Sequence, residues 1–222
     1  MSLLVVLSEV SDGNMYDPFD KSNEAIVSNR ERFLKKHTIT MQQTTRLDIT
    51  YDKNDFCKYR EVTSNDMGAG MSDDKVLSAD ALITRDHNHA LFLPLADCVG
   101  TVIYDKHKSV LMMTHLGRQS VEQDGGRKSV EYLVTNYGCI AKNLLVWLAP
   151  APGKEKYPLY AFDNRDFKEV VYEQLLSAGI LRSNITDNPA DTTKDLRYFS
   201  HSEFLQGRRE KDGRHSIVAM MT

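Results

Sequence analysis

The chain has 222 residues, a formal net charge of −3 and 41% hydrophobic residues. This length allows one substantial core, so the sequence predicts a single domain over residues 1–222. Because the charges nearly cancel and form no long block of one sign, the composition argues against nucleic acid or a membrane surface as a partner.

The first part of the chain predicts a strand, a helix and an irregular connection. An apolar run at 2–6 has the length of a strand, and turn residues follow it. Apolar residues on one helical face predict a helix at 22–36. Alternating polar and apolar residues at 38–51 favour a half-buried strand or hairpin. The segment 53–77 has little periodicity and predicts a long connection, a kind of segment that often carries function.

The rest of the chain alternates strands with helices. Short apolar runs separated by polar turns predict adjacent strands of one sheet, at 81–84, 90–95, 99–104 and 109–114. A capping-box spacing predicts a helix from about Ser120 to Gly138. A strand at 144–149, a helix at 164–178 and a strand at 216–221 complete the pattern. We therefore expect an α/β fold with a central mixed sheet flanked by helices.

The cysteines and the apolar runs predict a cytoplasmic protein. No apolar run is long enough for a membrane helix, and the first residues lack the pattern of a signal peptide. Cys57, Cys98 and Cys139 are odd in number and widely separated, unlike a secreted disulfide framework. Without a C-x-x-C pair, a zinc ribbon and a thioredoxin motif are excluded.

A cysteine and a histidine end two neighbouring strands of the predicted sheet. Cys98 follows the apolar run at 90–95, and His115 closes the strand that returns after the next hairpin. Because hairpin-linked strands end side by side, we expect both side chains to face one point. Such a pair can form a thiolate nucleophile or bind a metal. The alternative is a buried thiol beside a satisfied turn histidine.

An arginine follows the histidine at the expected start of a helix. His115 is separated from Arg118 by Leu116 and Gly117, and the helix is expected to begin close to Ser120. A helix N-terminus next to a guanidinium favours phosphate or an oxyanion. Arg118 could equally be a solvated surface residue.

Several strings together resemble one known family. ADALIT at 79–84, ADC at 96–98, YD at 104–105 and H-x-G at 115–117 are similar, in this order, to the core signature of the YfiH-type laccase-domain family. Further similar strings are Ser28-Asn29-Arg30, Asp66-x-Gly68-x-Gly70, Ala149-Pro150 with Gly153, Asp191-Thr192, Tyr198-Phe199-Ser200 and Asp212-Gly213-Arg214. The resemblance thus covers nearly the whole chain.

This resemblance implies a function and a fold. Family members are described as polyphenol oxidases, and as purine nucleoside phosphorylases with adenosine deaminase activity. Their layered α/β fold is similar to that of a toxin cysteine deamidase domain. The resemblance implies Cys98 and His115 as catalytic residues, with Arg118, Ser200 and Arg214 binding substrate or phosphate.

The family also has a trio of His, Cys and His that binds metal or takes part in catalysis. The last two correspond to Cys98 and His115, but the Q-V-H-G string of the first is absent. Residues 42–45 are one candidate replacement, and Cys57 is the better one. Cys57, Cys98 and His115 would make a zinc site with an open fourth position, with copper as the alternative metal. Cys57 is equally well explained as a partly buried loop thiol.

Two family strings are altered in this chain. H-A-G-W-R-G is here His115-Leu116-Gly117-Arg118-Gln119-Ser120, and S-Y-R-R is Ser200-His201-Ser202-Glu203. These changes are compatible with a different substrate or with loss of catalytic activity. A true multicopper laccase is disfavoured, because seven histidines with one H-x-H cannot build its copper cluster. We interpret that H-x-H, His87 and His89, as an exposed polar turn.

The sequence therefore leaves three functional hypotheses. The first is a purine nucleoside phosphorylase or deaminase that acts on adenosine or inosine, with phosphate as co-substrate. The second is a cysteine hydrolase or amidase that uses Cys98 and His115. The third is a non-catalytic member of the family. A monomer and a homodimer are both compatible with the sequence.

Overall fold

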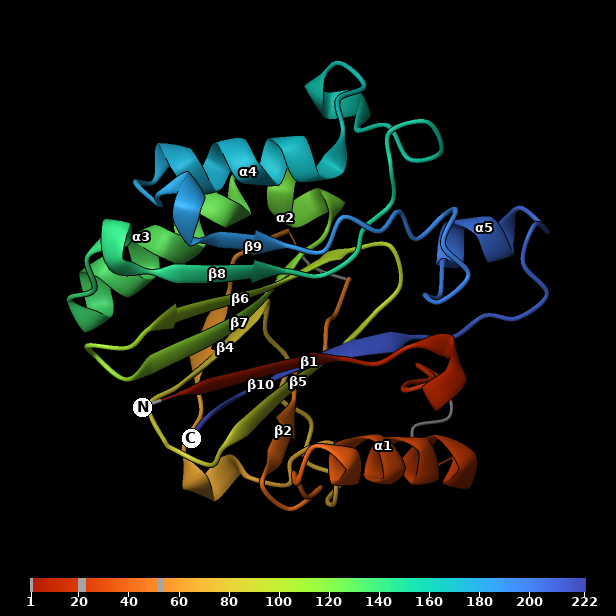
Figure 1. The fold of residues 1–222 in the computed structure, drawn as a ribbon, viewed down its shortest axis with the longest axis horizontal. Helices are drawn as coiled ribbons and strands as arrows, with labels where there is room; N and C mark the ends of the chain where they lie inside the picture. The colour runs from red at the N-terminus through yellow and green to blue at the C-terminus, as the bar shows by residue number, and fades with distance from the viewer. Residues whose placement is uncertain (1, 20–22, 52–53) are drawn as a thin grey trace.

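The strands are arranged as two layered sheets with helices on both outer sides (Figure 1). The computed structural model describes residues 2–19, 23–51 and 54–222. Within these residues, one sheet has six strands in the order β3-β4-β7-β6-β8-β9, and the other has four in the order β1-β10-β5-β2. The predicted α/β class is confirmed. The expected single central sheet is wrong, and the domain span of 1–222 stays a prediction.

The strands are short and mostly buried. They are β1 (Leu3–Leu7), β2 (Thr44–Arg46), β3 (Tyr59–Glu61), β4 (Ala81–Thr84), β5 (Ala90–Leu95), β6 (Val99–Asp105), β7 (Val110–Leu116), β8 (Leu145–Leu148), β9 (Ile185–Asp187) and β10 (His215–Met221). The helices are α1 (Glu24–Lys36), α2 (Arg118–Glu122), α3 (Gly125–Tyr137), α4 (Phe167–Ser177) and α5 (His201–Leu205). No helix in this described part combines the length and apolarity needed to cross a bilayer. The cytoplasmic location stays a prediction.

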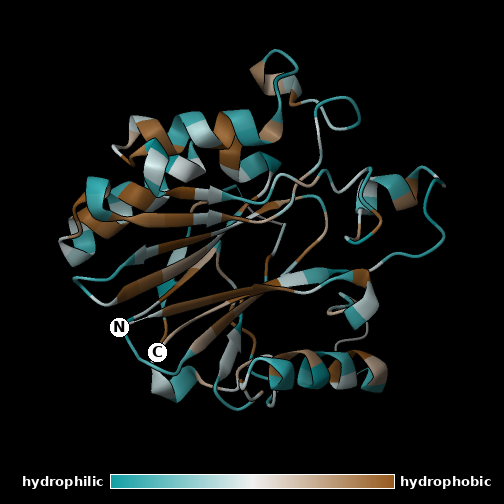
Figure 2. Ribbon diagram, in the orientation of Figure 1, coloured by the Kyte–Doolittle hydropathy of each residue, from teal (hydrophilic) through white to brown (hydrophobic). Residues whose placement is uncertain are grey.

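Three apolar clusters hold the layers together. One joins α3 and α4 to the six-stranded sheet, a second fills the space between the two sheets, and a third joins α1 to the four-stranded sheet. In Figure 2 the strands are largely hydrophobic, whereas hydrophobic and hydrophilic residues alternate along the helices. Since β4 to β7 are buried on both faces, their side chains contribute to two clusters at once.

The helices follow the predicted apolar faces, with one break. In α1, the Asn23 side chain caps the first turn and Phe33 is buried; the predicted start at Ser22 lies outside the described residues. The helix predicted from Ser120 is instead two helices, because Asp124 adopts a left-handed backbone (φ 65°) between α2 and α3. Its start is also earlier than predicted, at Arg118, with Gly117 as N-cap.

The run predicted at 90–95 does form a strand, but in a different sheet from its neighbours. β5 pairs with β10 and β2, whereas β6 pairs with β7 and β8. The chain therefore crosses from one sheet to the other through Ala96, Asp97 and Cys98. Asp97 has a positive φ of 77°, a strained value for a residue with a Cβ. Hydrophobicity alone could not reveal this crossover.

Three smaller predictions meet mixed outcomes. The segment 38–51 contains only the short strand β2, and 54–77 is mainly irregular, apart from β3; Lys53 lies outside the described residues. His89 is fully buried rather than exposed. Its ring nitrogens lie 2.7 Å from Thr45 Oγ1 and 3.3 Å from Thr84 Oγ1, which allows the imidazole to be buried.

Candidate active site

A cavity of about 470 Å³ opens where the chain crosses between the two sheets. Its volume lies in the range of small-molecule sites. The polar, ionisable and aromatic residues that line it include Tyr51, Asp97, Cys98, His115, Arg118, Tyr157, His201, Ser202 and Arg214. These residues come from distant parts of the sequence, so the cavity exists only in the folded chain.

The hairpin of β6 and β7 brings Cys98 and His115 together, as the sequence predicted. Gly100 on β6 is opposite His115 on β7, and Cys98 lies just before β6 begins. A Cβ added to Gly117 would lie 2.7 Å from His115 Cε1 and 3.5 Å from Cys98 Sγ. The side chains of Cys98 and His115 therefore both border the space that Gly117 leaves by having no side chain. Their catalytic role stays a prediction.

The Cys98 thiol is held in its neutral form. Burial is the largest influence, and with the negative charge of Asp97 it raises the pKa of Cys98 to about 12, although Arg214 and Arg118 act in the opposite direction. At neutral pH the thiol form therefore predominates. Cys98 is therefore suited to donate a weak hydrogen bond, and poorly suited to attack as a nucleophile.

Two predicted substrate residues lie in the cavity wall and one does not. Arg118 is exposed at the start of α2, and Arg214 is half-buried just before β10. Ser200 is buried beneath α5, where its hydroxyl accepts a hydrogen bond from the Glu203 amide at 3.3 Å. Ser200 is thus the N-cap of α5 and is not among the residues that line the cavity, and its predicted role in binding substrate or phosphate stays a prediction.

Asp97 connects the crossover to the C-terminal part of the chain. Its carboxylate is 4% exposed and accepts hydrogen bonds from Thr192 Oγ1 (2.8 Å) and from the Ser202 amide (2.7 Å). Asp191 likewise accepts from the Gly153 amide at 2.9 Å. Strings that resembled the family thus meet in space, and Asp97 and Ser202 of this group line the cavity.

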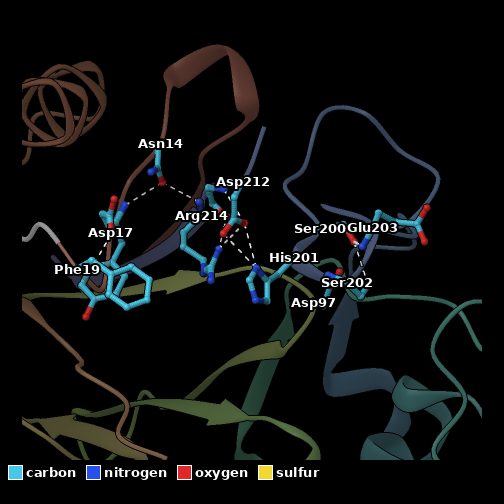
Figure 3. A network of polar contacts seen from close by, with 12 residues as sticks. Asn14, Asp17, Phe19, Asp97, Ser200, His201, Ser202, Glu203, Asp212 and Arg214 are labelled. Atoms are coloured by element: carbon cyan, nitrogen blue, oxygen red, sulfur yellow. Dashed lines mark hydrogen bonds and ion pairs between the residues drawn. The ribbon is translucent and has the colours of Figure 1, made fainter. Parts of the chain in front are cut away.

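Hydrogen bonds link two asparagines to Arg214, and Figure 3 shows Asn14, Arg214 and Asp212 of this group. Asn29 on α1 donates from Nδ2 to the Asn14 carbonyl at 3.0 Å. The Asn14 side chain accepts from the Arg214 amide at 2.7 Å. The guanidinium of Arg214 then donates to Asp212 Oδ1 at 2.9 Å. The Asn29-containing string therefore supports the cavity from a distance.

The predicted zinc ligands do not come together. Within the described residues, no three His, Cys, Asp or Glu side chains are arranged to hold a metal ion. Cys57 is absent from the cavity wall, and its Sγ contacts the Gln123 carbonyl at 4.0 Å, beyond α2. Because no described His, Cys, Asp or Glu joins Cys98 and His115 as a third donor, the proposed donor set fits neither zinc nor copper.

Sequence reasoning missed several cavity residues. His201 and Ser202 come from α5, while Tyr51 and Tyr157 come from irregular segments. Tyr51 packs edge-on to His115, with ring centroids 6.5 Å apart, and Tyr157 stacks on Phe167. The altered S-Y-R-R string was the one available signal for His201, since it marked a change in an otherwise similar segment.

These features define a class: a layered α/β protein whose small-molecule cavity joins a cysteine–histidine hairpin to two arginines. The family model described as "Multi-copper polyphenol oxidoreductase laccase" matches residues 7–162, and the chain belongs to this family. The predicted YfiH-type resemblance is thereby confirmed.

Relatives and solved structures agree with this assignment. The chain is 26% identical over 128 residues to purine nucleoside phosphorylase YlmD of Bacillus subtilis, a match that covers 57% of the chain and 45% of the relative. A purine nucleoside phosphorylase of Clostridium acetobutylicum is 30% identical over 79 residues, covering 36% and 34%. The matches span about half or less of these curated relatives.

The solved structures extend the similarity of fold to nearly the full chain. YlmD from Geobacillus stearothermophilus superposes with a TM-score of 0.85 at 20% identity, covering 99% of this chain and 92% of the other. The hypothetical protein YfiH of Bacillus licheniformis gives a TM-score of 0.83 at 19% identity, covering 99% and 93%. At this identity they show the fold alone.

Proposed function

We propose that this protein is a purine nucleoside phosphorylase-type enzyme, which cleaves adenosine or inosine with inorganic phosphate. The observation that carries the proposal is the convergence of Arg118 and Arg214 on the cavity that holds Cys98 and His115. Guanidinium groups suit a phosphate oxyanion. The names of the relatives point to the same reaction.

The cavity offers separate surfaces for the parts of the substrates. Arg118 and Arg214 would neutralise phosphate and direct one oxygen to the anomeric carbon of the ribose. Cys98, as a neutral thiol, and His115 would contact the ribose where phosphate and sugar meet. Tyr51 and Tyr157 supply aromatic surface for the purine ring. Because Cys57 lies away from the cavity, Cys98 and His115 are assigned to substrate contact rather than to a metal.

The competing cysteine hydrolase requires a thiolate. The raised pKa of Cys98 works against it, because burial and Asp97 both favour the protonated thiol. Deamination of adenosine, which the family resemblance implied, stays a prediction. It is tested by looking for inosine, rather than adenine, among the products.

The test is phosphate-dependent release of free base from inosine and adenosine. We expect wild-type protein to release hypoxanthine or adenine with phosphate and not without it. Cys98→Ser and His115→Ala should reduce this rate by at least tenfold, and Arg118→Gln should mainly raise KM for phosphate. Cys139→Ser and His107→Ala are matched controls, because neither residue lines the cavity.

Two results would contradict the proposal. The first is a wild-type rate equal to that of Cys98→Ser and His115→Ala, which would show only background hydrolysis. The second is base release that is independent of phosphate, which would assign the arginines another role. Monomer or homodimer, measured by light scattering on the same sample, is a separate prediction.

A further inference from the structure

A histidine and a carboxylate are paired at the C-terminal side of the cavity. His201, the first residue of α5, lies with its Nδ1 3.1 Å from both carboxylate oxygens of Asp212 (Figure 3). Arg214 donates to the same carboxylate at 2.9 Å. Asp212 does not line the cavity, whereas His201 and Arg214 both do. One carboxylate thus holds two cavity side chains in fixed positions.

The pairing determines which ring nitrogen of His201 is available. A carboxylate accepts hydrogen bonds, so Nδ1 carries its proton toward Asp212. Nε2, on the other side of the ring, is left to exchange a proton with a ligand. Burial would raise the pKa of Asp212, but Arg214 and His201 keep it below its ordinary value. Asp212 therefore presents a charged carboxylate to the Nδ1 proton of His201.

The surroundings of His201 favour proton exchange with solvent. Its side chain is 40% exposed, whereas His115, deeper in the same cavity, is 5% exposed. The Ser202 amide beside it is fixed by Asp97 at 2.7 Å, so α5 is tied to the crossover that carries Cys98. The position of His201 relative to Cys98 is therefore fixed, and its side chain remains accessible to solvent.

We propose that His201, oriented by Asp212, protonates the purine base as it leaves. This step rests on the proposed function. A phosphate oxygen forms the new bond to the ribose anomeric carbon, and the bond from that carbon to the purine nitrogen breaks. Its electron pair passes to the base, which takes the Nε2 proton. Neutral His201 keeps its Nδ1 proton toward Asp212 and regains the lost proton from water.

The same carboxylate would then serve both substrates. Through Arg214 it fixes a guanidinium for phosphate, and through His201 it fixes the donor for the base. Phosphate and base lie on opposite sides of the reacting carbon in a displacement reaction. A shared Asp212 would keep the two side chains at a fixed separation, with Arg214 toward the phosphate and His201 toward the base.

The test uses two nucleosides that differ in their need for a proton. The hypoxanthine of inosine leaves as an anion unless it is protonated, whereas the base of 7-methylinosine carries a positive charge and leaves as a neutral molecule without a proton. We expect His201→Gln to lower kcat on inosine by about 10²–10³-fold, a size typical of lost general acid catalysis. On 7-methylinosine the loss should be less than about threefold. Asp212→Asn should show the same preference with a smaller loss of kcat, together with a raised KM for phosphate on both nucleosides, because Asp212 also holds Arg214.

His107→Gln is the matched control, because His107 is exposed on the β6–β7 turn and does not line the cavity. Equal losses on both nucleosides, or no loss on either, would overturn the assignment of His201 while leaving phosphorylase activity in place. A wild-type protein inactive on both nucleosides would instead overturn the proposed function, and the assignment with it. Thermal unfolding of each variant confirms that the fold is intact.

Discussion

Asp97 should contribute to stability through the connection that it makes between the crossover and the C-terminal segment. Its carboxylate is nearly fully buried and accepts two hydrogen bonds, from Thr192 Oγ1 and from the Ser202 amide. We expect Asp97→Ala to lower the free energy of unfolding by about 3–5 kcal/mol. Asp97→Asn should cost about 1–2 kcal/mol.

The difference between the variants follows from the hydrogen bonds. Each bond to a charged acceptor contributes roughly 1.5–3 kcal/mol, and a neutral one roughly 0.5–1.5 kcal/mol. Alanine loses both bonds and leaves the Ser202 amide without its acceptor. Asparagine keeps both, because its oxygen accepts from Ser202 and its amide donates to the Thr192 hydroxyl. Asparagine also tolerates the positive φ at this position better than alanine does.

Urea unfolding, followed by tryptophan fluorescence and circular dichroism, measures these changes. Asp195→Asn is the control, since Asp195 is a surface carboxylate paired with Arg197. An Asp97→Ala protein within about 0.5 kcal/mol of wild type would refute the structural role. A second readout is iodoacetamide alkylation of Cys98, which should be faster in Asp97→Asn because Asp97 raises the pKa of the thiol.

Three further predictions concern other sites. Alkylation of Cys98 should increase about tenfold per pH unit from pH 7 to 10, because burial raises its pKa to about 12; a plateau below pH 9, measured by peptide mass spectrometry, would contradict this. Burial lowers the pKa of His215 in the folded protein to about 3. Between about pH 6.5 and 3 the unfolded chain therefore binds one proton more than the folded chain. The free energy of unfolding falls as pH falls through this window. His215→Phe should keep the edge-on contact with Tyr198. It should also remove up to about 1.4 kcal/mol per pH unit of the acid-induced loss in the free energy of unfolding, which urea unfolding at pH 4.5 and 7 would detect. Gly100→Ala should cost about 1–3 kcal/mol in the same assay, because the new Cβ would overlap Leu95 where the two sheets meet; an unchanged midpoint would show that the sheets can separate freely.

The sequence predicted those features that depend on neighbouring residues. The helical faces of α1 and α4 appeared as local apolar periodicities, and the strands β4 to β7 as short runs between polar turns. The meeting of Cys98 and His115 followed from the same local logic, since a tight hairpin fixes the register of its two strands. The resemblance to a family added residues that no local pattern marks.

The membership of β5 in a second sheet was not predictable in this way. A strand buried on both faces has no polar side to show which neighbour it pairs with. The separation of Cys57 from the cavity was equally hidden, because an irregular segment can lead a side chain in many directions.

The sequence by itself thus determined the α/β class and the cysteine–histidine hairpin, which are set by periodicity and by contacts close along the chain, and its strings showed the resemblance to the family. Only the tertiary structure decided which residues line the candidate cavity. Asp97, Thr192 and Ser202 meet because the crossover and the C-terminal segment pack together, and that packing also brings His201 to the cavity. Contacts between residues about a hundred positions apart depend on how the whole chain buries its apolar surface.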